Sequence, residues 1–366
     1  MTPAIPCLAP GSNPVFSSRG LLGKSCRAHV ESALAAAFPQ GVHSLLLWVR
    51  EDAPCLSPQT LALLEEQACN GLLAAVFAAD GCTPLAAAFP KQAQAFFASE
   101  SGESLDVDRI LRRADCPFPI THCQPADPGE AFAVTDAASY AAAFRLLKAR
   151  ITQQHMENGV IVLEPERTVI EAEVSIQPGT VIYAGNTLQG STSIGADCTL
   201  YPNNRLQNAV VGHDTTVENS VLLDCSVGSH TTVGPFAYLR PQSVIGDNCR
   251  IGDFVEIKNS AIGDGTKVSH LTYVGDSDLG KDINLGCGVV FVNYDGKTKT
   301  RSTVEDHAFI GCNCNLVSPV RIGKNAYLAA GSTVVEDVPE DSLYVARSRG
   351  VLKENWVVRR KEQGKL

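Results

Sequence analysis

The sequence has no long apolar stretch and no surplus of positive charge. No segment of its 366 residues approaches the roughly 18 consecutive apolar residues of a membrane-spanning helix. There are 30 Lys and Arg against 39 Asp and Glu, which gives a net charge of -9. Because nucleic acids and anionic membranes are bound by clustered cations, this balance argues against both partners. We expect a small-molecule partner, no nucleic acid and no membrane span.

Cysteine pairs of the metal-binding or redox type are also missing. The 13 cysteines are an odd number and include no CxxC pair. The first residues, MTPAIPCLAP, contain no charged segment followed by an apolar run, so we expect no secretory signal. The sequence therefore predicts free thiols in a reducing cytoplasm.

The composition changes along the chain and divides it into four parts. Residues 1–135 are rich in Ala, Leu and Phe and contain short apolar runs such as HSLLLWV at 43–49, which predicts an α/β domain. Residues 136–157 combine an Asp start with good helix formers and predict a connecting helix. Residues 158–345 are rich in Val, Ile, Gly, Asp, Asn and Thr, and residues 346–366 form a C-terminal tail.

The third part carries an internal repeat of six residues. Aliphatic side chains fall at six-residue steps from Ile170 to Leu206 and, after several five-residue steps, again from Val233 to Ile257. Gly commonly follows the aliphatic residue. This hexapeptide pattern predicts a parallel β-helix of about nine or ten triangular coils, in which each aliphatic side chain stacks on its counterpart one coil away. A β-sandwich would instead alternate with a period of two.

The repeat predicts that two cations meet at one corner of this solenoid. Arg240 and Lys258 each follow an aliphatic residue, and their positions in the repeat are one full coil apart. Two like charges at one corner repel unless an opposite charge lies beside them. A carboxylate such as Glu256 could supply it, but a phosphate ligand explains the pairing more directly.

The same count places His270 at the head of a column. His270 lies two positions after Val268, and Cys287 occupies the equivalent position one coil later. If the segment NYDGKTKTRS loops outward, Cys312 and Ala330 continue the column. Small side chains beside an imidazole leave room for an extended ligand whose reactive end lies at His270. A plain surface histidine is the alternative.

Seven segments closely resemble one known family. They are FAYLRP at 236–241, GDFVEIK at 252–258, KVSHLTYVGD at 267–276, NLGCG at 284–288, VNYDGK at 292–297, FIGCNCNLVSPV at 309–320 and LAAGSTV at 328–334. They resemble the acetyltransferase half of bacterial bifunctional N-acetylglucosamine-1-phosphate uridylyltransferase/glucosamine-1-phosphate N-acetyltransferase, from about residue 134 to 356. The resemblance implies a left-handed β-helix and a homotrimer with active sites between subunits. It also implies acetyl transfer from acetyl-CoA to glucosamine-1-phosphate, for UDP-N-acetylglucosamine and cell-wall synthesis.

The resemblance further implies roles for individual residues. His270 matches the general base that takes a proton from the attacking amine. The implied contacts to the sugar phosphate are Arg240, Lys258, Tyr273, Asn284 and Lys299, of which Lys299 reaches a neighbouring subunit. The implied contacts to acetyl-CoA are Cys287, Asn293, Tyr294, Cys312, Ala330 and Arg347. We expect no metal in this acetyl transfer.

Other interpretations remain open. A metal-dependent hexapeptide enzyme, such as a carbonic anhydrase of this fold, would need three His around zinc, including a close pair. The sequence indicates no such pair among His213, His230, His270 and His307. The chain could also acetylate another amino sugar, retain uridylyl transfer, or be a noncatalytic solenoid.

Residues 1–135 resemble the uridylyltransferase half of the same family only in part. LLGKSCRAHVESAL at 21–34 is similar to a family helix, and LLLWVREDAPCLSP at 45–58 puts Asp52 at a metal-ligand position. The family's glycine loop is replaced by CLAPGSNPVFSSRG at 7–20, whose prolines remove N–H donors. Thr135 stands where relatives have a second, Asn ligand. Because a lone Asp is a poor Mg²⁺ site, we expect a reduced nucleotidyltransferase-like domain without uridylyl transfer.

Overall fold

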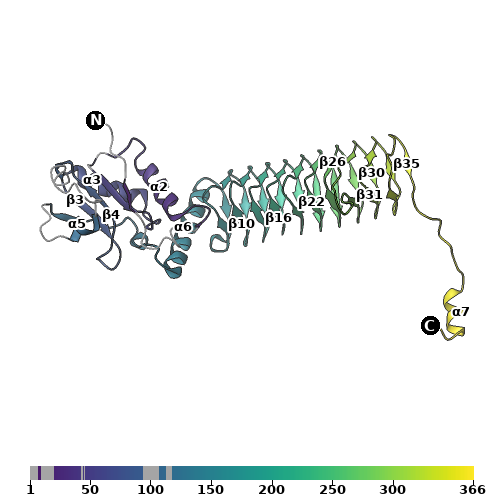
Figure 1. Cartoon of the computed structure of the whole chain (residues 1–366), viewed down its shortest axis with the longest axis horizontal. Helices are drawn as coiled ribbons and strands as arrows, with labels where there is room; N and C mark the ends of the chain where they lie inside the picture. The colour runs from purple at the N-terminus through teal and green to yellow at the C-terminus, as the bar shows by residue number, and fades with distance from the viewer. Residues whose placement is uncertain (1–6, 10–19, 43, 45, 94–106, 113–117) are drawn as a thin grey trace. The chain divides into compact units, whose positions relative to one another are not determined.

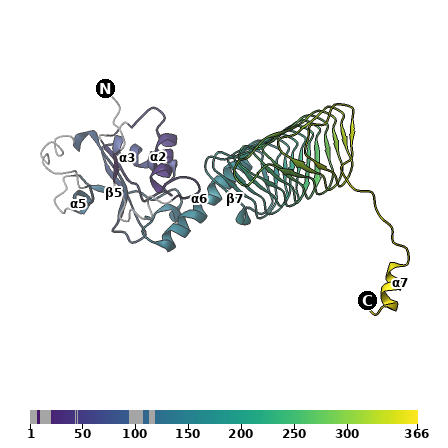
Figure 2. The ribbon, with the colours of Figure 1, turned by 45° about the vertical axis from the view of Figure 1, so that its right-hand side comes forward.

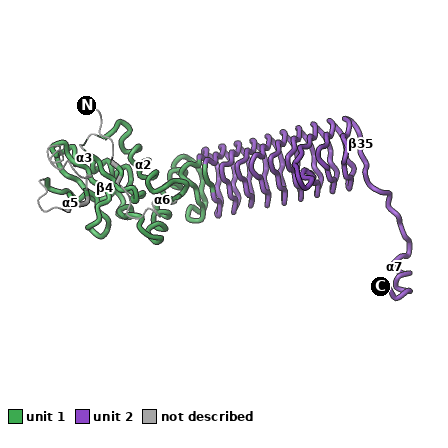
Figure 3. Tube along the Cα trace, in the orientation of Figure 1, with its two compact units in different colours: residues 1–174, 188–190 green, residues 175–187, 191–366 purple. Residues whose placement is uncertain are grey.

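The computed structural model describes residues 7–9, 20–42, 44, 46–93, 107–112 and 118–366 (Figure 1). The chain divides into two compact units (Figure 3). The first unit comprises residues 1–174 and 188–190, and the second comprises residues 175–187 and 191–366. Most of the segment that replaces the glycine loop, residues 10–19, lies outside the described residues.

The first unit contains a five-stranded mixed sheet in the order β1-β2-β4-β3-β5. Its strands are β1 (Cys7–Ala9), β2 (Leu46–Arg50), β3 (Leu73–Phe77), β4 (Pro84–Phe89) and β5 (Ile120–His122). Its helices include α2 (Cys26–Ala37), α3 (Pro58–Cys69) and α5 (Val107–Arg112). Side chains alternate along β2, so Leu47 and Val49 pack in one core with residues of α2 and α3, whereas Trp48 packs in another with residues of α5. The unit is an α/β domain.

Helix α6 (Ala137–Glu157) also belongs to the first unit and covers the segment predicted to be helical. It begins with a capping box between Asp136 and Ser139, which satisfies amide groups of the first turn. Its buried face includes Ala143 and Leu147, which cluster with Leu21. The short elements η1 (Lys91–Ala93), η2 (Pro128–Glu130), η3 (Pro165–Arg167), β6 (Ile161–Val162) and β7 (Val169–Ile170) complete the unit. Among the described residues, no helix combines the length and apolar character needed to cross a membrane.

The second unit is a parallel β-helix whose coils stack along one axis (Figure 2). Its strands form three parallel sheets. One contains β10 (Thr187–Gln189), β13 (Arg205–Gln207), β16 (Val221–Leu223), β19 (Tyr238–Leu239), β22 (Glu256–Lys258), β25 (Tyr273–Gly275), β28 (Val290–Val292), β31 (Asn315–Val317) and β34 (Thr333–Val334). Another contains β8 (Ser175–Ile176), β11 (Ser193–Ile194), β14 (Val210–Val211), β17 (Ser226–Val227), β20 (Val244–Ile245), β23 (Ala261–Ile262), β26 (Ser277–Leu279), β29 (Ser302–Val304) and β32 (Arg321–Ile322).

The third sheet forms the remaining side of the triangular coil. It contains β9 (Val181–Ile182), β12 (Thr199–Leu200), β15 (Thr216–Val217), β18 (Thr232–Val233), β21 (Arg250–Asp253), β24 (Lys267–His270), β27 (Asn284–Leu285), β30 (Phe309–Ile310), β33 (Tyr327–Leu328) and β35 (Leu343–Tyr344). After the last strand, the chain ends in α7 (Trp356–Glu362).

The aliphatic ladder forms the core of the solenoid, which confirms the predicted fold class. Ile194 and Leu200 are fully buried, and Leu239 pairs with Ile257 one coil later. At the corners, short polar residues such as Asp197 and Asn248 adopt the left-handed backbone region, which Asn and Asp tolerate better than most residues. Each coil therefore turns through residues that the repeat supplies at fixed positions.

Candidate functional site

A column of side chains runs along one corner of the solenoid. Its members are Asp253, His270, Cys287, Cys312 and Ala330. The amide that follows each later member donates a hydrogen bond to the carbonyl of the member one coil before, at distances between 2.8 and 3.4 Å. The structure therefore brings together the four residues that the repeat placed in this column, and it adds Asp253 before them.

His270 is held by a carboxylate. Its Nδ1 lies 2.6 Å from Oδ1 of Asp253, and the two side chains are 52% and 38% exposed. This hydrogen bond lowers the pKa of Asp253, because it stabilises the charged carboxylate. A carboxylate only accepts, so Nδ1 carries the proton and Nε2 of the neutral ring keeps its lone pair. Sequence reasoning missed Asp253, although counting back one coil from His270 would have found it.

The far end of the column is occupied by Arg347. Its Nη1 donates a hydrogen bond of 2.9 Å to the carbonyl oxygen of Ala330. Between Arg347 and His270, Cys287 is partly exposed and Cys312 is exposed. A molecule lying along the column would meet small side chains in the middle and charged or ionisable groups at both ends.

Three cations gather on another part of the solenoid surface. Arg240 follows β19 and Lys258 ends β22, and these two strands pair in register. The nearby Lys299 is the main cause that lowers the pKa of Lys258, with partial desolvation and Arg240 as further causes. Arg240 donates from Nη1 to Oε1 of Glu256 at 2.7 Å, which raises its own pKa. The cations repel one another, and an anion would relieve that repulsion.

Lys299 belongs to a hairpin loop. Tyr294 and Lys299 form an antiparallel bridge, and the Asp295 carboxylate accepts from the amides of Lys297 and Thr298 at the turn. These hydrogen bonds lower the pKa of Asp295 to about 2, and the bond from the Thr298 amide is the largest cause. The loop folds back so that Lys299 lies beside Lys258 of its own chain. That Lys299 also reaches a neighbouring subunit stays a prediction.

Two predicted acetyl-CoA contacts lie in or beside this loop. Asn293 is buried, and its Nδ2 donates to Oδ2 of Asp276 and lies 3.5 Å from the hydroxyl of Tyr273. Its amide therefore helps to position Tyr273 rather than facing solvent. Tyr294 is 54% exposed, and its hydroxyl donates to the carbonyl of Gly296 at 2.7 Å.

One predicted sugar contact lies on another sheet. Asn284 begins β27, where it pairs with Lys267 and Phe309, whereas Tyr273 begins β25. Asn284 therefore lies at the start of a strand whose equivalent on the previous coil ends at His270. Asn284 and Tyr273 therefore begin strands that belong to different sheets.

Two histidines of the solenoid are close neighbours, contrary to the sequence prediction. The ring centroids of His213 and His230 are 4.8 Å apart in an edge-to-face arrangement. The prediction was wrong because it compared positions along the chain, whereas the two residues are one coil apart and their rings lie on the same corner.

In the first unit, the two remnants of a metal site do not form one. Asp52 is fully buried, and Nε and Nη2 of Arg50 each donate to its carboxylate at 2.9 Å. Thr135 is exposed, and its backbone amide donates to the Ser139 hydroxyl at 3.0 Å. The Asp52 carboxylate is thus neutralised by a guanidinium, so the residues present do not fit a Mg²⁺ ion.

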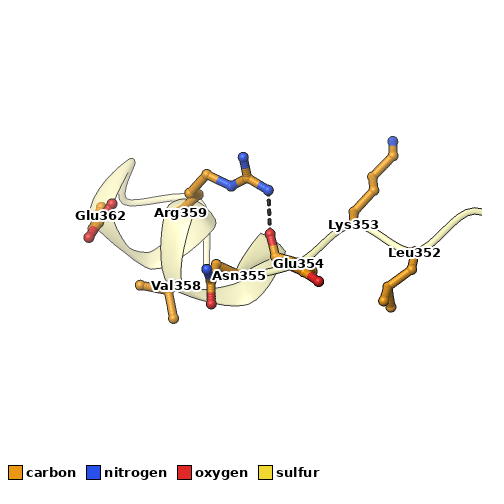
Figure 4. Close-up of a pocket in the computed structure, with 7 residues that line it drawn as sticks. All are labelled: Leu352, Lys353, Glu354, Asn355, Val358, Arg359 and Glu362. Carbon is orange, nitrogen blue, oxygen red and sulfur yellow. Dashed lines mark hydrogen bonds between the residues drawn. The ribbon is translucent and has the colours of Figure 1, made fainter.

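The C-terminal tail forms a hollow of its own (Figure 4). It is lined by Leu352, Lys353, Glu354, Asn355, Val358, Arg359 and Glu362. Arg359 donates to the carbonyl of Glu354, and in Figure 4 the other side chains point in different directions. None of the predicted site residues lines this hollow, so the column remains the candidate site.

Comparison with known proteins agrees with the solenoid. Residues 224–259 and 301–335 match the family described as bacterial transferase hexapeptide (six repeats). The chain is 54% identical over 213 residues to Bifunctional protein GlmU of Clostridium acetobutylicum, covering 58% of this chain and 47% of that protein. It is 48% identical over 260 residues to Bifunctional protein GlmU of Brevibacillus brevis, covering 71% and 56%.

A solved structure of UDP-N-acetylglucosamine acyltransferase from Campylobacter jejuni matches with a TM-score of 0.38 and 22% identity, covering 51% of this chain and 78% of that one. That likeness is too low to bear on function. The chain spans about half the length of the curated relatives that it matches. Two segments of the chain thus match bacterial transferase hexapeptide repeats, and the chain is similar to part of Bifunctional protein GlmU.

Proposed function

We propose that this protein transfers the acetyl group of acetyl-CoA to the 2-amino group of glucosamine-1-phosphate, giving N-acetylglucosamine-1-phosphate for UDP-N-acetylglucosamine and cell-wall synthesis. The observation that carries the proposal is the contact of 2.6 Å between His270 and Asp253 at the head of the column. A histidine whose tautomer is fixed by a carboxylate, exposed beside a column of small residues, suits a general base. The family resemblance supplies the identity of both substrates.

His270 would remove the proton that the amine loses during the reaction. As the amine nitrogen attacks the thioester carbonyl, the C–N bond forms and Nε2 of His270 takes the proton. The C–S bond then breaks, and CoA leaves as its thiolate. Asp253 touches neither substrate in this scheme and acts as a positioning residue, because its hydrogen bond keeps Nε2 unprotonated before the attack.

The three cations would hold the sugar phosphate. Arg240, Lys258 and Lys299 place positive charge at one corner, where the nearby Lys299, with Arg240 as a smaller cause, lowers the pKa of Lys258. A phosphate dianion would relieve this repulsion and accept hydrogen bonds from all three groups. Tyr273, positioned by Asn293, lies on β25, which pairs with the strand that ends at Lys258, and would contact the sugar.

Acetyl-CoA would lie along the rest of the column. Its thioester would reach His270, and the remainder would pass Cys287, Cys312 and Ala330 toward Arg347 and Tyr294. Arg347 would then offer a cation to the phosphates of the cofactor. No metal ion takes part in this scheme.

The proposal includes a homotrimer with the active site between subunits. Asn284 and Tyr273 begin strands of different sheets, and in this proposal a neighbouring subunit supplies Asn284 to the sugar. It also includes a cytoplasmic location, because Cys225 and Cys314 are free thiols that a reducing compartment preserves.

We also propose that the first unit no longer transfers uridylyl groups. The Arg50–Asp52 pair supports this, because it occupies the carboxylate that a magnesium ion would need. The unit would instead serve packing or a partner.

The decisive experiment is to incubate the purified full chain with acetyl-CoA and glucosamine-1-phosphate and to measure the acetylated product by mass spectrometry. A panel of glucosamine, glucosamine-6-phosphate and galactosamine-1-phosphate tests the acceptor. We expect product from glucosamine-1-phosphate in preference to the others. No product from any acceptor would reject acetyl transfer, and a preference for another amino sugar would correct the substrate.

A further inference from the structure

A second cluster of ionisable side chains lies on a different corner of the solenoid. His213 and Asp214 follow β14, and His230 follows β17, one coil later. The amide of His230 donates to the carbonyl of His213 at 3.0 Å, so the two turns are in direct register. Asp214 and His230 both adopt the left-handed backbone region, so they occupy the same place in successive turns.

The carboxylate lies between the two imidazoles. Oδ2 of Asp214 is 2.6 Å from Nδ1 of His213 and 3.9 Å from Nδ1 of His230. One ligand atom from each of the three residues lies within 4.8 Å of the other two. Ligand atoms around a tetrahedral Zn²⁺, at bond lengths of about 2.0 Å, are about 3.3 Å apart, so small side-chain rotations would be sufficient.

The side chains are accessible and able to make these rotations. Those of His213, Asp214 and His230 are 54%, 46% and 52% exposed. Half-exposed side chains adjust at little cost, and an ion can reach them from solvent. On the next coil, the Asp247 carboxylate accepts from the amide of Ser229 at 2.7 Å, which places a further negative charge on this corner.

The ligand set indicates which ions fit. Imidazole nitrogens favour Zn²⁺, Ni²⁺ and Cu²⁺ over Mg²⁺ and Ca²⁺, which prefer sets made only of oxygen. Two imidazoles and one carboxylate leave a fourth tetrahedral position for water. We propose that His213, Asp214 and His230 form a site for a divalent transition metal ion of the Zn²⁺ class, which would bridge two successive coils of the solenoid.

This site is separate from the column of His270. Asp214 and His230 occupy a turn position that Asn248 and Asp282 occupy on later coils. The column from Asp253 to His270 lies on another corner. The ion would act by joining coils rather than by assisting acetyl transfer. The three ligands come together only in the folded chain. An ion that binds the folded chain and not the unfolded chain would stabilise the solenoid.

The test compares Zn²⁺ binding by the reduced, chelator-treated full chain with binding by the double variant His213→Ala/His230→Ala. We expect the double variant to lose one Zn²⁺ equivalent per chain, and each single variant to bind that equivalent at least tenfold more weakly. The wild-type chain and the double variant have the same cysteines, so the difference between them excludes Zn²⁺ bound by thiols. Zn²⁺ should also raise the melting temperature of the wild-type chain but not that of the double variant.

The matched control is His307→Ala. His307 occupies the same turn position on a later coil and lies 3.7 Å from the Asp282 carboxylate, but it forms no cluster of three ligands in the described part of the chain. This variant should bind Zn²⁺ like the wild type. Circular dichroism and acetyl transfer verify that each variant is folded. Equal Zn²⁺ stoichiometry and affinity in the wild type and in a folded double variant would overturn the site.

Discussion

The two units of this chain differ in how distance along the sequence relates to distance in space. In the solenoid, functional pairs are about one coil apart: Asp253 and His270 are separated by 17 residues. In the first unit, Ser57 donates to Glu130 across 73 residues. In the solenoid, the repeat therefore gives the coil and the face of a polar side chain from its residue number. In the α/β unit, the position of a polar side chain depends on how the strands and helices pack together.

The charges of the two units are also used differently. In the first unit, Glu130 is fully buried and accepts from the Ser57 amide at 2.9 Å and from Arg150 Nη2 at 2.8 Å. Such a carboxylate has its hydrogen bonds satisfied inside the fold. On the solenoid, Asp253 and His270 are partly exposed and open to a ligand. The first unit thus keeps this charge inside its fold, whereas the solenoid presents an imidazole and a carboxylate at its surface.

The largest effect is expected from His270→Ala. Loss of the general base should lower kcat for acetyl transfer by about 100-fold or more. Trimer assembly, followed by size-exclusion chromatography with light scattering, should persist because the side chain lies on the surface. Turnover close to the wild-type value would disprove the base assignment and remove the main difference between the two units.

Removing a cation from the phosphate corner should have the next largest effect. Lys258→Ala or Arg240→Ala should raise KM for glucosamine-1-phosphate about 10-fold to 100-fold, since hydrogen bonds to charged groups contribute about 1.5–3 kcal/mol. KM for acetyl-CoA should change little. Lys324→Ala, an exposed lysine away from the column, serves as the control. Equal effects on both substrates would contradict the assignment of this corner to the phosphate.

Asp253→Ala should have a smaller effect, because Asp253 acts through His270. We expect kcat to fall about tenfold, equivalent to about 1.4 kcal/mol of transition-state stabilisation, with little change in either KM. Asp253→Asn retains an oxygen that accepts from Nδ1 and should recover part of the loss. If the Asn and Ala variants were equally impaired, the hydrogen bond alone would not explain the role of Asp253.

The smallest effect on acetyl transfer is expected from Asp52→Ala. The rate should be unchanged, whereas the first unit should lose about 1–3 kcal/mol of unfolding free energy, because the Arg50 guanidinium would lose its hydrogen bonds to this carboxylate. Denaturant unfolding measures that loss. The wild-type chain with Mg²⁺, UTP and N-acetylglucosamine-1-phosphate should release no pyrophosphate. Robust release that Asp52→Ala abolishes would show that the first unit is an active uridylyltransferase.

The six-residue period predicts some positions of the candidate site and not others. The period of the repeat, together with one outward loop at NYDGKTKTRS, predicts Cys287, Cys312 and Ala330 on successive coils after His270. The same period also implies the Asp253–His270 contact and the His213–His230 pair, because each joins two residues about one coil apart. The period does not predict the burial of Asn293 or the position of Lys299, because both depend on how the loop after β28 folds back.

The sequence by itself determined the solenoid, its core and the corner on which each repeated position lies, because a fixed period converts chain position directly into coil and face. Only the tertiary structure decided which polar groups bond to one another. Asp253 turns to His270, Asn293 to Asp276, and Arg50 to Asp52, and these choices depend on side-chain rotamers and loop paths that no period specifies. In the first unit the neighbours of most strands were a tertiary decision, since the order β1-β2-β4-β3-β5 places β4 between β2 and β3 and so departs from the order along the chain.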